Sequence, residues 1–112
     1  MRPYSRGLPL GPTRFIIFCS QMRVARRYLI SGRVQGVGFR VFTEAQAAVE
    51  GLHGWVRNLG DGRVEALFEG DVEAVDRAEA KLRRGPAGAR IEDITVDSIA
   101  PSGRATGFRI RE

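Results

Sequence analysis

The segment from Ser31 to Arg40 ends in two glycines and an arginine, Gly36, Gly38 and Arg40, in an order that suits the binding of an anion. Gly36 and Gly38 let the backbone turn so that several N–H groups point at one place. The segment reads as a strand, a glycine turn and the start of a helix, and a helix N-terminus adds partial positive charge. Arg40 would place a guanidinium at the same position. The pattern therefore predicts a phosphate site.

Arg40 is the first candidate because it breaks a local rule. A cation in the first helical turn opposes the helix dipole, at a cost of about 0.3–1 kcal/mol. Such violations are expected where function requires them, and a bound anion would remove this conflict. The spacing alone equally allows an ion pair between Arg40 and Glu44, one turn further on.

Other kinds of chemistry find little support in the residue types present. The turn matches neither G-x-x-x-x-G-K-[ST] nor G-x-G-x-x-G, which argues against ATPase and dinucleotide-binding folds. One histidine, His53, and one cysteine, Cys19, cannot supply the usual nitrogen and sulfur ligands of a metal centre. There is no G-x-S-x-G motif, and Gly38 stands where the loop could carry a nucleophile. We expect a site without metal or cofactor, which acts by noncovalent positioning of the substrate and by electrostatic stabilisation.

Asn58 is a second candidate, at the end of a strand-like run before the turn Leu59–Gly62. A neutral amide can accept a hydrogen bond from water while donating to a developing oxyanion, which suits the positioning of water. The alternative is structural, because asparagine is common next to turns for its backbone hydrogen bonds.

The candidate residues require a framework of strands and helices, and the sequence predicts one. Strand character covers residues 26–34, 55–58, 63–69, 91–99 and 107–111, with an Asp-Gly hairpin between the second and third runs. The first helix is predicted to turn Val41, Ala45, Ala48 and Leu52 towards the core. The second follows Asp71 as N-cap, with Val72, Val75, Glu79 and Leu82 on neighbouring turns, and ends at Gly85-Pro86.

This order of elements predicts the fold. The order β-α-β-β-α-β, followed by a short C-terminal strand, is typical of an α+β protein with the ferredoxin-like α/β sandwich, or split βαβ, arrangement. We expect an antiparallel sheet with two helices on one face.

Length and composition limit the remaining possibilities. The 112 residues suffice for one domain, and a single cysteine with no convincing export signal favours a cytoplasmic location. The apolar run Phe15–Cys19 is too short for a secretory or membrane-spanning segment. We expect residues 1–21 to be a disordered N-terminal extension and residues 22–112 to form the domain. Of the net charge of +5, Arg2, Arg6 and Arg14 contribute three and leave +2 on residues 22–112.

Two separated motifs resemble those of the acylphosphatase family. Gly32–Arg40 resembles the first and Gly54–Asn58 with Gly62 the second, while Gly107–Arg111 is similar to the closing strand of that family. The resemblance implies the ferredoxin-like fold and hydrolysis of an acyl phosphate to a carboxylate and inorganic phosphate, without metal or cofactor. By the match, Arg40 binds phosphate and Asn58 positions water. The loop residues Gln35, Gly36, Val37, Gly38 and Phe39 would supply backbone N–H donors.

The expected partners follow from this resemblance. They are a small acyl phosphate substrate, with inorganic phosphate or sulfate as product-like ligands, and we expect a monomer that binds neither nucleic acid nor membrane. A ferredoxin-like nucleic-acid-binding module is the alternative, but the run Gly38–Phe42 falls on a turn and helix rather than on a sheet. A stand-alone relative of the carbamoyl-phosphate-handling module of hydrogenase maturation factors is a third possibility. Glu112 stands where family members commonly end in tyrosine.

Overall fold

The computed structural model describes residues 22–112, so the predicted extension over residues 1–21, with Cys19, lies outside the described residues. The elements follow in the predicted order, and most ends lie within three residues of the prediction. They are β2 (Arg23–Arg33), α2 (Phe39–Glu50), β3 (His53–Asn58), β4 (Val64–Asp71), α3 (Val72–Arg84), β5 (Arg90–Ile99) and β6 (Phe108–Arg111). The predicted α+β ferredoxin-like arrangement is confirmed.

The strands form one five-stranded sheet in the order β5-β2-β4-β3-β6. The first four pair antiparallel, as predicted, whereas β6 pairs parallel to β3. The sheet is therefore mixed. The last residues of β5 and the first residues of β3 lie at the same end of the sheet. A strand that enters there along the β3 edge runs in the direction of β3.

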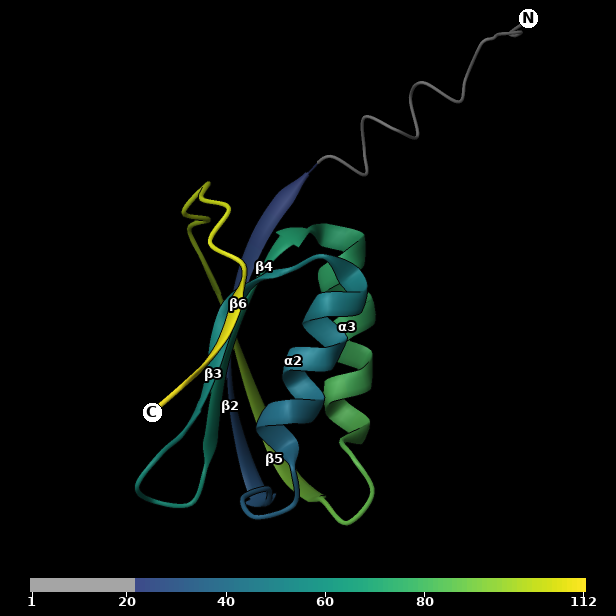
Figure 1. The fold of residues 1–112 in the computed structure, drawn as a ribbon, viewed down its shortest axis with the longest axis vertical. Helices are drawn as coiled ribbons and strands as arrows, with labels where there is room; N and C mark the ends of the chain where they lie inside the picture. The colour runs from purple at the N-terminus through teal and green to yellow at the C-terminus, as the bar shows by residue number, and fades with distance from the viewer. Residues whose placement is uncertain (1–21) are drawn as a thin grey trace, which may run out of the picture.

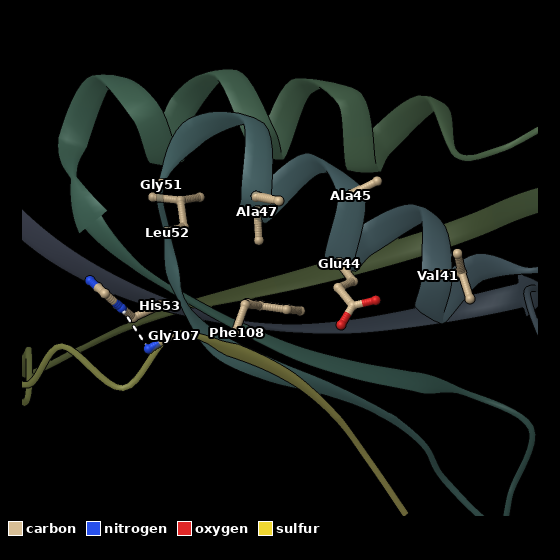
Figure 2. A pocket seen from close by; sticks show the side chains of 10 residues that line it. Val41, Glu44, Ala45, Ala47, Gly51, Leu52, His53, Gly107 and Phe108 are labelled. Carbon is tan, nitrogen blue, oxygen red and sulfur yellow. Dashed lines mark hydrogen bonds between the residues drawn. The ribbon is translucent and has the colours of Figure 1, made fainter.

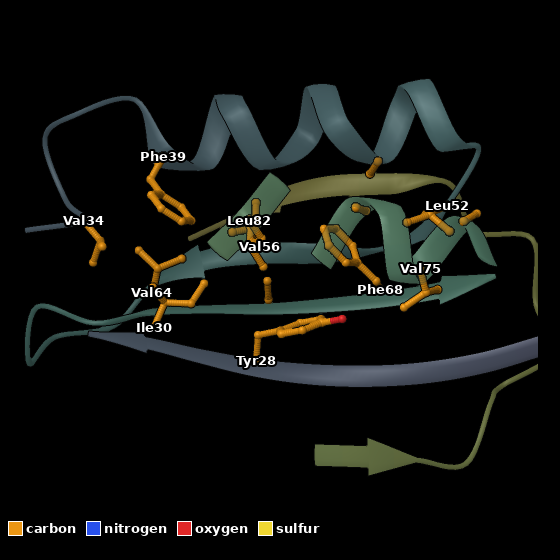
Figure 3. Close-up of a cluster of buried hydrophobic side chains, with 14 residues drawn as sticks. Tyr28, Ile30, Val34, Phe39, Leu52, Val56, Val64, Phe68, Val75 and Leu82 are labelled. Atoms are coloured by element: carbon orange, nitrogen blue, oxygen red, sulfur yellow. The ribbon is translucent and has the colours of Figure 1, made fainter. Parts of the chain in front are cut away.

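Both helices cover the same face of the sheet, as Figure 1 shows. Between them and the sheet lies a core of apolar side chains (Figure 3), whose largest members include Tyr28, Phe39 and Phe68. Val64, Ala66 and Phe68 alternate inward along β4 and are fully buried, as predicted. In the part of the chain that the structure describes, no helix covers the opposite face of the sheet.

The inward face of α2 differs from the prediction. Phe39, Thr43 and Ala47 are buried, whereas Val41 is 63% exposed and Ala45 and Ala48 are also exposed. The Phe39 ring sets the rotation of the helix, and the Thr43 hydroxyl is satisfied in the core because it donates to the Phe39 carbonyl oxygen at 2.8 Å. Alanine side chains are small and constrain the rotation of α2 about its axis only weakly. The predicted inward face, which relied on Ala45 and Ala48, was therefore wrong for these residues.

The second helix, α3, matches its prediction more closely. Ala74, Val75, Ala78 and Leu82 are buried, and the helix ends at Gly85 as expected. Asp71 is the N-cap of α3, as predicted, although its side chain makes no capping hydrogen bond.

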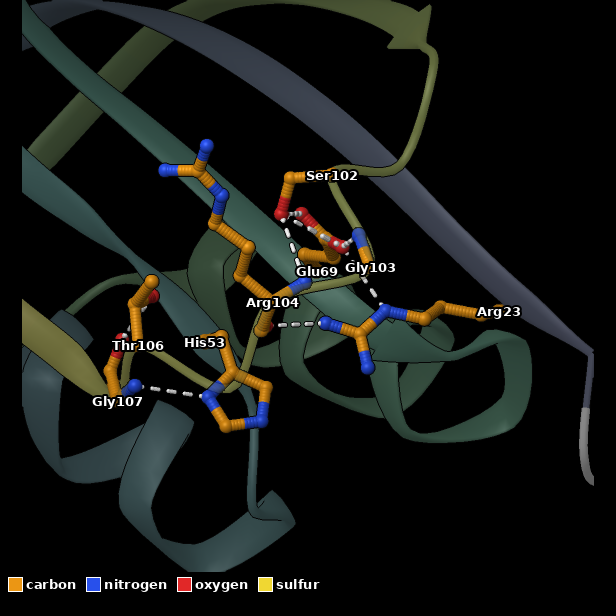
Figure 4. Close-up of polar contacts among 8 residues, drawn as sticks. All are labelled: Arg23, His53, Glu69, Ser102, Gly103, Arg104, Thr106 and Gly107. Carbon is orange, nitrogen blue, oxygen red and sulfur yellow. Dashed lines mark hydrogen bonds and ion pairs between the residues drawn. The ribbon is translucent and has the colours of Figure 1, made fainter.

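Polar contacts, some of them part-buried, attach the connection from β5 to β6 to the sheet (Figure 4). The Glu69 carboxylate accepts hydrogen bonds from the Gly103 N–H at 2.9 Å, from the Ser102 hydroxyl at 3.0 Å and from Arg23 at 2.8 Å. Burial alone would raise the pKa of Glu69, but these donors outweigh it and lower the pKa to about 2. His53 accepts a hydrogen bond from the Gly107 N–H at 2.8 Å through Nδ1. These contacts hold the start of β6 against β3.

Candidate active site

The turn between β2 and α2 has the backbone shape that the glycines were expected to allow. Gly36 and Gly38 adopt φ values of 75° and 78°, a region that side-chain-bearing residues rarely occupy. Gly38 is the N-cap of α2, and the first intrahelical hydrogen bond runs from the Phe42 N–H to the Gly38 carbonyl oxygen at 3.0 Å. The N–H groups just before Phe42 therefore have no acceptor within the helix.

A hollow of about 120 Å³ lies beside this turn. Five of the seven predicted site residues line it, although they come from separate parts of the chain: Gly36, Gly38, Phe39, Arg40 and Asn58. Val34 and Val41 complete the lining. The remaining two predicted residues, Gln35 and Val37, do not line the hollow, and Val37 packs against the core instead.

The side chain of Gln35 makes contacts that the sequence did not predict. Its side-chain Nε2 donates to the carbonyl oxygens of Leu59, at 2.8 Å, and Arg63, at 3.0 Å. These two carbonyls flank the turn between β3 and β4, so Gln35 ties the glycine turn to the segment that directly follows Asn58. Sequence reasoning missed this brace, because the contact joins residues 24 positions apart and leaves no local pattern.

The Arg40 guanidinium has no carboxylate partner among residues 22–112, where no ion pair joins it to Glu44. The alternative explanation of Arg40 as the partner of Glu44 is therefore wrong. Within α2 the first turn contains no acidic residue, and no side chain caps the N-terminus. Among residues 22–112, the positive charge at this end of the helix therefore has no acidic side chain paired with it.

Asn58 is the last residue of β3, as expected, and a charged ladder stabilises the strands around it. Glu65 on β4 accepts hydrogen bonds from Arg57 at 2.8 Å and Arg27 at 2.6 Å, which joins three neighbouring strands. Burial would raise the pKa of Glu65, but these two guanidinium groups outweigh it and lower that pKa. The ladder fixes β3 next to β4 directly before Asn58.

The geometry agrees with the comparison to known proteins. The acylphosphatase family model matches residues 26–110, which include all of the candidate site. The chain belongs to the acylphosphatase family. It is 51% identical over 85 residues to an acylphosphatase of Rubrobacter xylanophilus, with 76% of this chain and 77% of that protein covered. An acylphosphatase of Koribacter versatilis is 47% identical over 85 residues, and the match again covers 76% of this chain and 77% of that protein.

Solved structures of acylphosphatases have the same fold. That from Bacillus subtilis superposes with a TM-score of 0.76 at 37% identity and covers 80% of this chain and 99% of its own. A full-length HypF in its phosphate- and nucleotide-bound form gives a TM-score of 0.72 at 26% identity, over 81% of this chain but 12% of that protein. The resemblance to acylphosphatases thus extends over nearly the whole relative, whereas HypF matches over a small part.

Hydrolysis of acyl phosphates is therefore the activity of this enzyme, which fits a hollow lined by glycines, one arginine and one asparagine. Within residues 22–112 no three His, Cys, Asp or Glu side chains lie together as a metal site would require. No helix in the described part of the acylphosphatase is long and apolar enough to cross a membrane.

Proposed function

We propose that Arg40 and the backbone N–H groups of the Gln35–Phe39 turn bind the phosphoryl group of the substrate, while Asn58 positions the attacking water. The proposal is supported by the convergence of Gly36, Gly38, Arg40 and Asn58 on one hollow of about 120 Å³. A guanidinium and the N-terminus of α2 would face the same phosphate charge, which offsets the unfavourable position of Arg40 in the helix.

The reaction can proceed with these groups alone. The water oxygen forms a bond to phosphorus as the bond from phosphorus to the acyl oxygen breaks, and the leaving group departs as a carboxylate. Arg40 is the only ionisable side chain that lines the hollow within the described residues. Because a guanidinium is a poor base, the proton of the water would pass to an oxygen of the phosphoryl group. No metal or cofactor enters this scheme.

The observation that carries the proposal is Arg40 at the N-terminus of α2, where no side chain of residues 22–112 caps the helix or pairs with the guanidinium. The test is hydrolysis of benzoyl phosphate by purified protein, with and without EDTA and with added inorganic phosphate or sulfate. We expect turnover that EDTA leaves unchanged and that both anions inhibit competitively. Chelator-sensitive activity would contradict the metal-free scheme, and a lack of phosphate inhibition would contradict the binding site.

Asn58 can be tested separately from phosphate binding. In Asn58→Ala we expect kcat to fall by about 10²-fold or more, because a preorganised polar group is lost near the reacting atoms. The inhibition constant of inorganic phosphate should stay within about twofold of wild type. An equal loss of phosphate affinity would show that Asn58 binds phosphate rather than water.

We further propose that the enzyme acts as a cytoplasmic monomer without nucleic acid as a partner. Several arginines on the open face of the sheet are already paired: Arg23 with Glu69, and Arg27 and Arg57 with Glu65. Such pairing leaves less free positive charge for a phosphate backbone. Salt-dependent filter binding with single-stranded RNA should give no retention at physiological salt, and sedimentation should give the mass of one chain.

A further inference from the structure

A larger groove runs along the outer side of α2, between this helix and β6. Its volume is about 560 Å³, and most of its walls are apolar: Val41, Ala45 and Ala48 belong to the helix, Leu52 directly follows it, and Phe108 belongs to β6. Figure 2 shows Val41 and Ala45 on α2 and Phe108 on β6, with the groove between the helix and the strand. We call this feature the acyl groove. The exposed alanines that sequence analysis had placed in the core thus line a concave surface.

The acyl groove begins at the rim of the proposed phosphate site. Val41 lines both the 120 Å³ hollow and the groove, and it directly follows Arg40. From Val41 to Ala48 the helix advances by about two turns, on the order of 10 Å. An extended medium-length acyl chain that starts at the phosphate site could lie along this length.

We propose that the acyl groove binds the acyl part of the substrate, and that the enzyme therefore prefers acyl phosphates with apolar chains. This inference rests on the proposed position of the phosphoryl group beside Arg40. The phosphate hollow is small, so the acyl group must lie outside it. At the Val41 edge it meets an apolar surface, whose burial by an apolar chain is favourable.

The Glu44 carboxylate, which lines the groove, should also select substrates by the charge of their acyl group. Its carboxylate points into the space between α2 and Phe108 (Figure 2), and it has no ion-pair partner within residues 22–112. A second carboxylate on the acyl group would meet like charge at a partly water-excluded surface. The groove should therefore reject dicarboxylic acyl phosphates and accept uncharged ones.

The first experiment compares acetyl, butanoyl, hexanoyl and octanoyl phosphate. Each methylene that enters the groove should raise kcat/KM by about two- to fourfold. In Ala48→Trp, the indole fills the groove, and the ratio of kcat/KM for octanoyl over acetyl phosphate should fall by at least about tenfold. Val49→Trp is the matched control, because Val49 is 73% exposed on the same helix but does not line the groove. Its ratio should equal that of wild type.

The second experiment compares benzoyl phosphate with para-carboxybenzoyl phosphate, which differ by one negative charge. Wild type should prefer benzoyl phosphate, and Glu44→Gln should reduce this preference by about tenfold, as expected for removal of a nearby like charge. An unchanged preference would show that Glu44 does not face the acyl group.

These results separate the groove from the phosphate site. If chain length has no effect in wild type, or if Ala48→Trp lowers kcat/KM for acetyl and octanoyl phosphate equally, the acyl groove is wrong while hydrolysis at Arg40 stands. If Ala48→Trp instead shifts a concentration-dependent association of the chain, the groove holds a second copy and the inference also fails. Retained acetyl phosphate turnover in Arg40→Ala would overturn the proposed phosphate site itself.

Discussion

Helices α2 and α3 lie side by side on one sheet face, but their charges are arranged in opposite ways. Helix α3 has Glu73 in its first turn and Lys81, Arg83 and Arg84 in its last, which is the favourable order for the helix dipole. Helix α2 has no acid in its first turn and no base in its last, and Arg40 occupies its second position.

The two helices also differ in how they pack against the sheet. Four side chains of α3 are buried, and its Glu79 accepts hydrogen bonds from Tyr28 and Arg26 on the sheet, both at 2.9 Å. Helix α2 buries three side chains and leaves Val41 and Val49 exposed. Both helices therefore contribute to the core, but α3 also makes polar contacts with the sheet, whereas α2 leaves Val41 exposed beside the candidate site. Arg40, whose charge opposes the helix dipole, thus marks the candidate site within an otherwise stable framework.

Among the tests of this contrast, we expect the largest effect when one arginine is removed from each helix in turn. Arg40→Ala should lower kcat/KM for benzoyl phosphate by at least about 10³-fold, because the charge that holds the phosphoryl group is lost. Arg40→Lys should also be poor, since a point charge replaces a planar two-pronged donor. Arg83→Ala should leave kcat/KM within about twofold. Equal losses in both alanine variants would mean that the difference between the helices is not functional.

Stability should respond in the reverse order. Leu82→Ala in α3 should lower the free energy of unfolding by about 2–5 kcal/mol, since a fully buried side chain leaves a cavity in the core. Val49→Ala in α2 should change it by less than about 0.5 kcal/mol, because that side chain is 73% exposed. Urea unfolding measures both. A large effect of Val49→Ala would show that the exposed side of α2 also stabilises the fold.

Acid should weaken the contact between α3 and the sheet. Burial would raise the pKa of Glu79, but hydrogen bonds from Tyr28, Arg83 and Arg26 outweigh it and lower the pKa. Ionised Glu79 thus contributes stability above about pH 4.5, its ordinary value, and this contribution is lost as pH falls below it. Glu79→Gln should cost about 1–2 kcal/mol at pH 7 and flatten the acid limb of unfolding stability. An acid limb as steep as that of wild type would exclude Glu79 as its cause.

Much of this framework was predictable from local patterns. Strand alternation, the Asp-Gly hairpin and the Gly85-Pro86 stop are short-range signals, and they located every element of the described chain. The rotation of α2 was not predictable, because it depends on which apolar side chain, Phe39 or Val41, the sheet accommodates. The parallel pairing of β6 likewise depends on where β5 ends in the assembled sheet.

The sequence pointed to five residues that the structure brings to one hollow, but not to the way in which they are brought together. Gly36, Gly38 and Arg40 are close in sequence, so their meeting follows from the turn itself. Asn58 joins them only because β2, β4 and β3 are neighbours in the sheet, and no local pattern encodes that order. The Gln35 brace and the acyl groove are tertiary features, and they required the structure.

The smallest expected effect concerns the sign of a charge at each helix. Without phosphate, Arg40→Gln should raise the free energy of unfolding by about 0.3–1 kcal/mol, because it removes a cation from the positive end of α2 at little change in helix propensity. Arg83→Gln should lower it by a similar amount, since that cation lies at the favourable end of α3 and pairs with Glu79.

Phosphate should then reverse the first of these differences. At about one hundred times its dissociation constant, it stabilises a protein that binds it by about 2.7 kcal/mol, which Arg40→Gln would lack. In thermal unfolding, the variant should melt above wild type without phosphate and below it with phosphate, whereas Arg83→Gln melts below wild type in both. A variant that melts below wild type even without phosphate would show that Arg40 stabilises α2, and the contrast between the helices would not reflect ligand binding.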